Sequence, residues 1–395
     1  MSGSRRQNIE DIKGFDSWGI SEQNFPSSGS SYDKLKFFLN YAILAPSSHN
    51  TQPWLFKIVD NSIELYADRA RALPVVDPED RELTMSCGVA LYHLVLAIRH
   101  FGFEYKLEVL PPMLANHDRH DEVAGGSGDD NLLARIVVEG INEKKQSNSE
   151  DEKLFQAITK RRTNRSMFQD RDIPDLLLSK LEAITHELLF PVQRTQSSPS
   201  SESSESSTPT VSVWLRFAKE EQIKNAIANL IAEGDRIQLS DKKFRRELAS
   251  WIHPNRSHSR DGIPGYALGF NDIMSLVAPF VIRTFDTGKG QAAKDRQLAT
   301  GSPITVILGT KRDEPLEWLN AGLILGKILL LTRSENVWTS FLNQPIEIPE
   351  LRQRLGEVLN KKEKGYPQLL LRMGYGEEVK PTPRRPIEEV IREKI

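Results

Sequence analysis

The turn over residues 45–54 constrains the fold of this chain more than any other stretch. It reads Ala-Pro-Ser-Ser-His-Asn-Thr-Gln-Pro-Trp, follows an apolar helical pattern over residues 35–44, and precedes a strand-like pattern from Leu55 to Val59. Pro46 and Pro53 each fix a φ angle and remove a backbone donor, so a helix cannot continue through both positions. The sequence therefore predicts a rigid connection between a helix and a strand.

The same turn is dense in polar groups. Ser47, Ser48, Asn50 and Gln52 carry hydrogen-bonding side chains, and Trp54 adds a large flat apolar face. This combination suits a planar ligand with polar edges. An ordinary helix-to-strand turn with an N-cap-like serine accounts for the same residues, and composition by itself favours this plainer interpretation.

Charge and cysteine content exclude several classes of protein. A formal net charge of −2 over 395 residues provides no basic surface for nucleic acid. The single cysteine, Cys87, excludes an intramolecular disulfide and fits a reducing compartment. The N-terminus lacks the apolar segment of a signal peptide, and the apolar stretches are shorter than the roughly 20 residues of a membrane-spanning helix. We therefore expect a cytoplasmic protein with no nucleic-acid or membrane partner.

Polar spacers divide the chain into two parts. Residues 1–30 carry little periodicity and are predicted to form a flexible N-terminal arm, and the Glu/Lys/Asn/Ser-rich residues 143–152 are predicted to be a linker. The first half then covers residues 31–142 and the second half residues 153–395. Within the second half, the serine-rich insert 194–210 cannot bury a core and is predicted to be a flexible loop.

Two long apolar helices suggest an internal duplication. Residues 88–99 (GVALYHLVLAIR) align without gaps on residues 322–333 (GLILGKILLLTR). Helices that are apolar on nearly all sides are buried. Their match suggests two similar halves packed about a pseudo-two-fold axis, although unrelated apolar helices also align easily.

Two arginine segments are candidates for binding an anion. Arg161, Arg162 and Arg165 lie within five residues, and guanidinium groups at that spacing repel one another unless solvent or an anion neutralises them. Arginines at a helix C-terminus are also favoured by the helix dipole, and spacing alone does not decide between the two interpretations. Near the other end, Pro383 and Pro386 flank an arginine pair, which is typical of a preorganised anion contact or of a solvated tail.

Together these segments resemble the FMN-dependent nitroreductase family. The turn is similar to the signature A-P-S-x-x-N-x-Q-P-W, and the histidine before asparagine resembles the Acg-type branch, in which two nitroreductase-like halves share one chain. The resemblance implies an α+β fold in which two fused halves form a pseudo-dimer, with mixed or antiparallel sheets flanked by helices.

The resemblance also implies a single FMN site between the halves, because the first half carries only the turn and the second only the arginines. The implied ring-side residues are Ser47, Ser48, Asn50, Gln52, Pro53, Trp54, Leu55 and Phe56. The implied phosphate-side residues are Arg161, Arg162, Thr163, Arg165 and Arg384. The chain departs from the commoner family spacing by one extra residue before Phe168, which leaves the role of Arg165 open. The Asp261–Gly265 segment resembles a G-I-P element of Acg-type chains and reads equally well as a plain turn.

The implied activity is hydride transfer from NAD(P)H through FMN to a nitroaromatic, quinone or similar small-molecule acceptor, with the flavin and no catalytic side chain carrying the chemistry. The histidine spacings do not indicate a metal site. The internal duplication would let one chain be the functional unit. Two alternatives remain open: a flavin-sequestering protein with little turnover, whose inserts 115–131, 194–210 and 253–290 form a lid, and a relative that has lost its cofactor.

Overall fold

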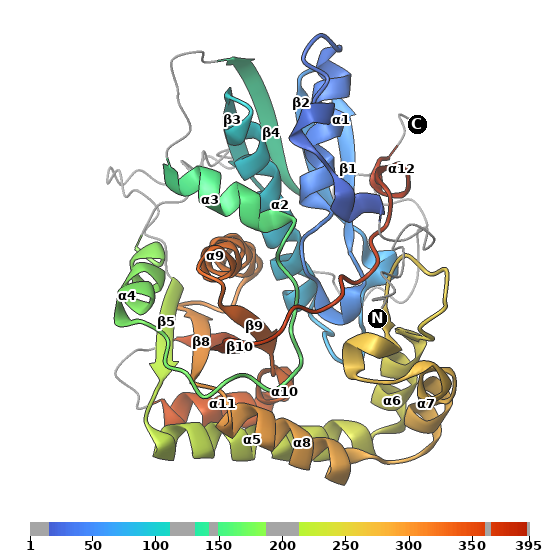
Figure 1. Cartoon of the computed structure of the whole chain (residues 1–395), viewed down its shortest axis with the longest axis vertical. Coiled ribbons are helices and arrows are strands. Elements are labelled where there is room, and N and C mark those ends of the chain that lie inside the picture. Colours follow the sequence, from blue (N-terminus) through green and yellow to red (C-terminus); the bar gives the residue numbers. More distant parts are fainter. Residues whose placement is uncertain (1–15, 111–130, 142–148, 187–212, 360–364, 393–395) are drawn as a thin grey trace, which may run out of the picture.

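A computed structural model describes residues 16–110, 131–141, 149–186, 213–359 and 365–392. The described residues form an α+β fold with two four-stranded sheets, one built from each half of the chain. In Figure 1 the first sheet lies above the second, and the helices α2 (Arg81–His100) and α9 (Pro315–Ser334) pass between them. A single apolar cluster joins both helices to residues of both sheets.

The first half contains an antiparallel sheet with the strand order β1-β2-β4-β3. Its strands are β1 (Trp54–Val59), β2 (Ser62–Ala67), β3 (Phe103–Val109) and β4 (Leu132–Ile141). The helix α1 (Ser31–Ala42) precedes the sheet and begins with a capping box between Ser30 and Asp33. In β1 the side chains of Trp54 and Phe56 lie on the same face and are fully buried, as the two-residue period of a strand requires.

The second half repeats this arrangement with the strand order β5-β8-β10-β9, again with antiparallel neighbours. Its strands are β5 (Val213–Ala218), β8 (Ile304–Thr310), β9 (Trp338–Phe341) and β10 (Tyr366–Gly374). Beneath this sheet in Figure 1 lie α5 (Glu221–Ser240), α8 (Gly288–Thr300), α10 (Gln344–Glu347) and α11 (Pro349–Val358). The helices α3 (Ser149–Ile158) and α4 (Asp175–Ile184) pack against α9.

An insertion between α5 and α8 forms a separate group of elements, drawn in yellow and gold in Figure 1. It consists of α6 (Lys242–Ser250), the short parallel pair β6 (Ile252–His253) and β7 (Ile263–Pro264), and α7 (Asp272–Thr284). The inner side of α7 lines a cavity described below, and its outer side exposes Ile273, Leu276 and Phe280 to solvent.

Two short segments add to the sheet edges, and the first of them comes from the opposite half. Ile391, after the terminal helix α12 (Ile387–Val390), bridges in parallel to Phe56 in β1. Thr163, just after α3, bridges to Thr339 in β9 in the same way. Arg161 donates to the Leu44 carbonyl oxygen and Arg384 donates to Asn50 Oδ1, so both arginine segments lie where the halves meet.

The two helices that align in the sequence cross at their matched glycines. A Cβ added to Gly88 would lie 2.5 Å from the carbonyl oxygen of Leu319 and 2.9 Å from Cα of Gly322. A Cβ added to Gly322 would lie 2.2 Å from the carbonyl oxygen of Met85. Equivalent positions in contact are the expected signature of a two-fold axis at the crossing, so the close backbone approach supports the predicted duplication.

Two regions differ from the sequence-based expectations. Both α2 and α9 are 20 residues long and apolar enough to cross a membrane by length and composition, but the most apolar windows are 89% and 78% buried within the protein. They are core helices here. Residues 16–30 of the predicted flexible arm form short 3-10 helices and bury Trp18. The residues of the predicted insert 194–210 lie outside the described residues, and the domain boundaries remain predictions.

We predict that Gly88→Ala destabilises the protein by about 1–3 kcal/mol, because the added methyl group must push apart two backbones in a fully packed core. Urea unfolding followed by circular dichroism measures this change. Gly356→Ala is the matched control, since nothing lies within 4 Å of its added Cβ and alanine is the better helix former. Equal stability of the two variants would contradict the assigned crossing.

Candidate functional site

The turn after α1 is held in an unusual backbone conformation. His49, Asn50 and Gln52 have φ angles of 48°, 56° and 54°, in the left-handed region that non-glycine residues rarely adopt. Each such residue costs roughly 1–3 kcal/mol. Part of this cost is offset locally, because Gln52 N donates to Ser47 Oγ at 2.8 Å. Strain of this kind persists only where the surrounding contacts demand it.

Asn50 joins the turn to two distant segments. Its Nδ2 donates to the carbonyl oxygens of Gly262 at 2.9 Å and Pro383 at 3.2 Å, and its Oδ1 accepts from the Arg384 guanidinium at 2.8 Å. Gly262 N in turn donates to the Asn50 carbonyl oxygen at 3.1 Å. The Asp261–Gly265 segment, which the sequence left open between a turn and a site element, is thus attached to the site.

Gln52 makes a second connection to the same segments. Its Nε2 donates to the carbonyl oxygen of Arg260 at 2.8 Å, and its Oε1 accepts from Arg385 N at 2.8 Å. With both ends of its amide used, Gln52 is fully buried and fixes the turn against the C-terminal segment. The side-chain amides of the turn therefore act first as a scaffold.

Two adjoining cavities open beside the turn. The first has a volume of about 600 Å³ and the second about 620 Å³. Residues that line both are Pro46, Ser47, Arg165, Ile263, Leu268, Lys294 and Leu298. The turn thus stands at the boundary between the cavities.

Of the residues predicted for a site, most reach these cavities. Those lining the first cavity are Ser47, Asn50, Arg161, Arg162, Thr163, Arg165 and Arg384. Ser47, Ser48 and Arg165 line the second. Gln52, Pro53, Trp54, Leu55 and Phe56 line neither of them, because strand β1 directs Trp54 and Phe56 into the core.

The first cavity has an unbalanced positive charge. Arg161 and Arg384 are 2% and 3% exposed, and across the described residues no carboxylate lies within ion-pair distance of either. Burial, followed by the neighbouring Arg162, lowers the pKa of Arg161 to about 9, and burial together with Arg161 and Arg162 lowers the pKa of Arg384 well below its usual value. Nε and one terminal nitrogen of Arg161 have no hydrogen-bond partner. Buried cations without partners are costly, so this cavity suits an anion.

Trp18 supports this arginine group from the N-terminal segment. The guanidinium of Arg162 lies 3.7 Å from the centre of the indole ring, and that of Arg384 lies at 4.8 Å. The indole Nε1 donates to the Thr382 carbonyl oxygen at 2.8 Å, which fixes the ring. Cation–π contacts hold the two arginines without neutralising them, so their charge stays available to a ligand.

The second cavity is polar near the turn and apolar elsewhere. Ser48 Oγ donates to the Glu82 carboxylate, which also accepts from Asn343 Nδ2 at 3.1 Å. Burial, and then the charge of Arg165, lowers the pKa of His49 to about 4, so its imidazole is neutral at pH 7. The opposite wall includes Phe244 and Met274 from the insertion. The cavity can therefore receive a largely apolar molecule beside a polar turn.

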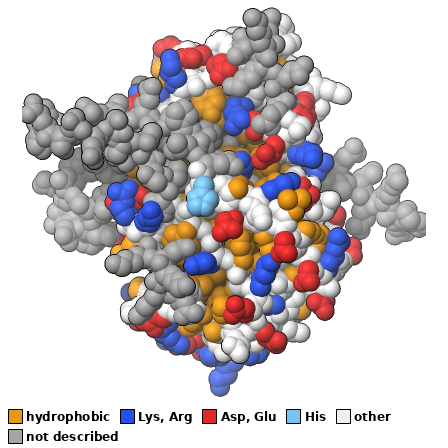
Figure 2. All heavy atoms as spheres, turned by 90° about the vertical axis from the view of Figure 1, so that its left-hand side faces the viewer, with side chains coloured by type: hydrophobic (Ala, Val, Ile, Leu, Met, Phe, Trp, Pro, Cys, Tyr) orange, Lys and Arg blue, Asp and Glu red, His pale blue; other side chains and the backbone are white. Residues whose placement is uncertain are grey.

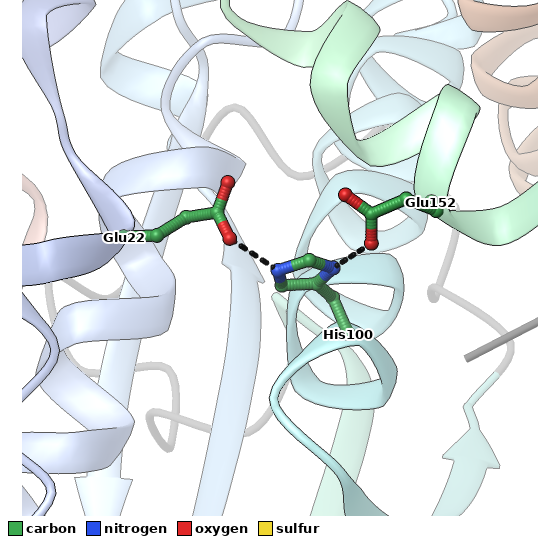
Figure 3. A group of neighbouring side chains, drawn as sticks. All are labelled: Glu22, His100 and Glu152. Carbon is green, nitrogen blue, oxygen red and sulfur yellow. Dashed lines mark hydrogen bonds and ion pairs between the residues drawn. The ribbon is translucent and has the colours of Figure 1, made fainter. Parts of the chain in front are cut away.

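A separate cluster joins Glu22, His100 and Glu152 (Figure 3). His100 Nε2 lies 2.8 Å from the Glu22 carboxylate and Nδ1 lies 3.1 Å from that of Glu152. The carboxylates approach opposite edges of the ring, and the ring stacks on Phe155 at 3.6 Å. This is the geometry of an ion-pair network that ties the N-terminal segment to α2 and α3. It contributes no residue to either cavity beside the turn.

The face drawn in Figure 2 shows no block of like charge among its described residues. On the face drawn in Figure 2, lysine and arginine side chains are interspersed with aspartate and glutamate. The first cavity, in contrast, brings together Arg161, Arg162, Arg165 and Arg384.

Two sequence relatives match almost the whole chain. No family model matches it. It is 27% identical over 367 residues to the Mycobacterium tuberculosis protein named "Putative NAD(P)H nitroreductase Rv3131", covering 91% of each sequence. It is 25% identical over 365 residues to a second protein of that species, "Putative NAD(P)H nitroreductase acg", covering 91% of this chain and 95% of the relative. These names confirm the resemblance to Acg-type nitroreductases on which the sequence interpretation rests.

Among solved structures, the fold is similar to the crystal structure of the FMN and NADPH-dependent nitroreductase NfnB from sphigopyxis sp. strain HMH. The identity is 17% and the TM-score is 0.39, and the match covers 61% of this chain and 98% of that chain.

Sequence reasoning missed several residues of the cavities. Trp18 lay in the predicted flexible arm, Tyr266 directly follows the Asp261–Gly265 segment, and Lys294 lies on α8, which carried no recognised motif. Glu82 lies in the first turn of α2, and only the fold places it against Ser48. The signal that could have been read was the charged residue at the start of an otherwise apolar helix.

We predict that orthophosphate stabilises the cofactor-free protein, because a dianion offsets the unpaired charge of the first cavity. A ligand at about 100 times its Kd adds about 2.7 kcal/mol to the free energy of unfolding. The melting temperature should rise with phosphate and not with sodium chloride of equal ionic strength. Arg161→Ala should lose this effect, and Arg256→Ala, which removes an exposed arginine, should keep it. An equal rise in both salts would exclude an anion site.

Proposed function

We propose that this protein is an FMN-dependent NAD(P)H oxidoreductase of the nitroreductase type. The observation that carries the proposal is the buried pair Arg161 and Arg384, which has no carboxylate within ion-pair distance among the described residues and adjoins the strained turn at the junction of the two halves. The names of the sequence relatives support the same activity.

The first cavity fits the phosphate end of FMN. Arg161 and Arg384 would hold the phosphate by charged hydrogen bonds, for which Arg161 still has free donors. Arg162, Thr163 and Arg165 line the same cavity and would contact the phosphate or the polyol chain. Both halves of the chain contribute, since the turn comes from the first and the arginines from the second.

The turn would hold the ring end of FMN. Ser47 and Ser48 face the second cavity and would contact the ring, with neutral His49 beside them. Asn50 and Gln52 keep the turn in place, and Pro53, Trp54, Leu55 and Phe56 support it from β1. In this proposal those residues position the site, and direct contact with the ring falls to the serines and the backbone of the turn.

When bound, FMN accepts a hydride from NAD(P)H and passes reducing equivalents to an acceptor. The protein contributes the position of the ring, the positive field at the phosphate and a cavity that excludes bulk water. The second cavity would take a nitroaromatic, quinone or similar small molecule next to the turn. A single chain supplies every segment of the site, which supports a functional monomer. The single cysteine, Cys87, fits a reducing, cytoplasmic setting.

A specific observation keeps sequestration of the flavin as a second candidate. Residues of the insert 253–290 line both cavities, among them Ile263 and Leu268. An insert in this place can restrict access to a bound flavin. The other two proposed lid segments, 115–131 and 194–210, lie outside the described residues except for Asn131.

Anaerobic titration with NADH and NADPH separates the two candidates. We expect the purified protein to carry flavin absorbance and to lose it as the nicotinamide is added, followed by recovery with a nitroaromatic or a quinone. Oxidised flavin that persists through the titration would support sequestration instead. A protein that stays colourless after incubation with FMN would contradict both.

We further predict that Arg161→Ala and Arg384→Ala each weaken FMN retention about tenfold to a hundredfold. A hydrogen bond between charged groups contributes about 1.5–3 kcal/mol, and 1.4 kcal/mol corresponds to a factor of ten. Equilibrium dialysis of the variants against FMN measures the change. Arg256→Ala is the control, because its side chain is exposed and lies outside both cavities. Unchanged retention in both arginine variants would refute the phosphate assignment.

A further inference from the structure

One corner of the second cavity has buried acids that the proposed function does not use. Asp235 on α5, Asp295 on α8 and Glu347 on α10 all line this cavity. Asp235 and Asp295 are 3% and 6% exposed. Carboxyl groups are rarely buried this deeply without a partner, so their surroundings define what the corner can bind.

The corner has more hydrogen-bond acceptors than donors. Gln344 Nε2 donates to Asp235 Oδ1 at 3.0 Å and to Asp295 Oδ2 at 2.9 Å, which uses both of its amide hydrogens. Asp235 Oδ2 and Gln344 Oε1 are buried atoms with no hydrogen-bond partner. Buried acceptors without donors are costly, so a group that brings several donors is favoured here.

The charge of the corner also favours a group that brings hydrogen-bond donors. Within the described residues, no lysine, arginine or histidine lies within ion-pair distance of Asp235 or Asp295. The nearby ammonium group of Lys294 donates to the Leu268 carbonyl oxygen at 3.5 Å. Burial, followed by Asp295, raises the pKa of Asp235 to about 7, while Gln344 and Arg236 act to lower it. Burial also raises the pKa of Asp295, against the influence of Gln291, Lys294 and Arg372.

A metal ion does not fit this corner. In the described part of the chain, the group of three potential ligands close enough to share an ion is Glu22, His100 and Glu152, which lies elsewhere. An organic cation needs only one or two carboxylates and can use the unpartnered amide oxygen. The remaining wall, which includes Leu239, Phe244 and Leu248, is apolar and can receive the rest of such a molecule.

We propose that the second cavity binds compounds in which an ammonium group is carried on an apolar body, with the ammonium donating to Asp235 and Gln344. The proposal rests on the proposed function, because it narrows the class of acceptor that this cavity admits. An ammonium group supplies three donors and one positive charge, and the corner lacks both.

Calorimetric titration of the FMN-loaded, oxidised protein with three matched probes tests this proposal. The probes are 2-(4-nitrophenyl)ethylammonium, neutral 1-ethyl-4-nitrobenzene and anionic 3-(4-nitrophenyl)propionate. We expect the ammonium probe to bind at least about tenfold more tightly than the neutral one, with the anion weakest. Equal affinity of the ammonium and neutral probes would overturn the proposal and indicate that water satisfies the corner.

The pH dependence gives a second, independent readout. The carboxylate form of a group with a pKa of about 7 rises from about one tenth at pH 6 to about nine tenths at pH 8. Affinity for the ammonium probe should therefore rise up to about tenfold over this range, and affinity for the neutral probe should not change. An ammonium affinity that stays constant or falls with pH would contradict the role of Asp235.

Asp235→Asn tests the residue directly, because asparagine keeps the shape and removes the charge. We expect about a tenfold loss of affinity for the ammonium probe, unchanged affinity for the neutral probe, and unchanged FMN content. Glu233→Gln is the matched control on the same helix, since its side chain pairs with Arg354 and does not line the cavity. Loss of both probes in Asp235→Asn while its melting temperature is retained would count against a charge-specific role.

Different measurements would refute the proposed function and the inference about the ammonium group. Absence of flavin from the protein, measured by its absorbance, would remove the proposed function. The corner is built from protein side chains alone, so calorimetry still reports whether it prefers the ammonium probe. Retained flavin with no such preference would remove only the inference about the ammonium group.

Discussion

The contact between Gly88 and Gly322 is the constraint on which the arrangement of the molecule depends. Two helix backbones can approach this closely only where both residues are glycine. Both helices are buried along almost their whole length. The crossing fixes how the two sheets face one another. The segment that contains Ile391 extends from the second half to the sheet of the first half. A site composed of both halves is the geometric consequence.

At the junction of the two halves, buried groups of opposite charge lie in separate cavities. Among the described residues, the first cavity is lined by arginines and no carboxylate, and the carboxylates Asp235 and Asp295 in the far corner of the second have no cation within ion-pair distance. Each set destabilises the unliganded protein, since burial penalises charged groups of either sign. The two penalties do not cancel, because the Coulomb interaction between the sets is weaker than a direct ion pair. In the two proposals made above, each cavity binds a ligand that carries the missing charge.

Periodicity and turn chemistry predicted most of the regular structure. The apolar helices over residues 88–99 and 322–333 and the strand from Leu55 to Val59 were all recognisable, and they lie within α2, α9 and β1. Elements such as α7, α10 and β9 were missed. The last two are each only four residues long, so long-range contacts and not local pattern decide their conformation.

The candidate site was predicted in part for a similar reason. A motif identifies which residues occur together, but not whether a side chain contacts a ligand or supports one that does. Asn50 and Gln52 each bond to segments more than 200 residues away, and no local pattern contains that information. The alternation of β1 could have placed Trp54 and Phe56 together on the buried face, since that inference needs only the two-residue period of a strand.

The strained backbone of the turn depends on contacts with distant segments. Three residues in the left-handed region are stable only while Asn50 and Gln52 hold the distant segments in place. Those segments include Arg384 of the first cavity and Gly262 of the insertion that lines both cavities. A ligand that neutralises Arg384 would therefore act on the same hydrogen-bonded junction that positions the covering insert. Through this junction, Asn50 connects Arg384 of the first cavity directly with the insertion by hydrogen bonds.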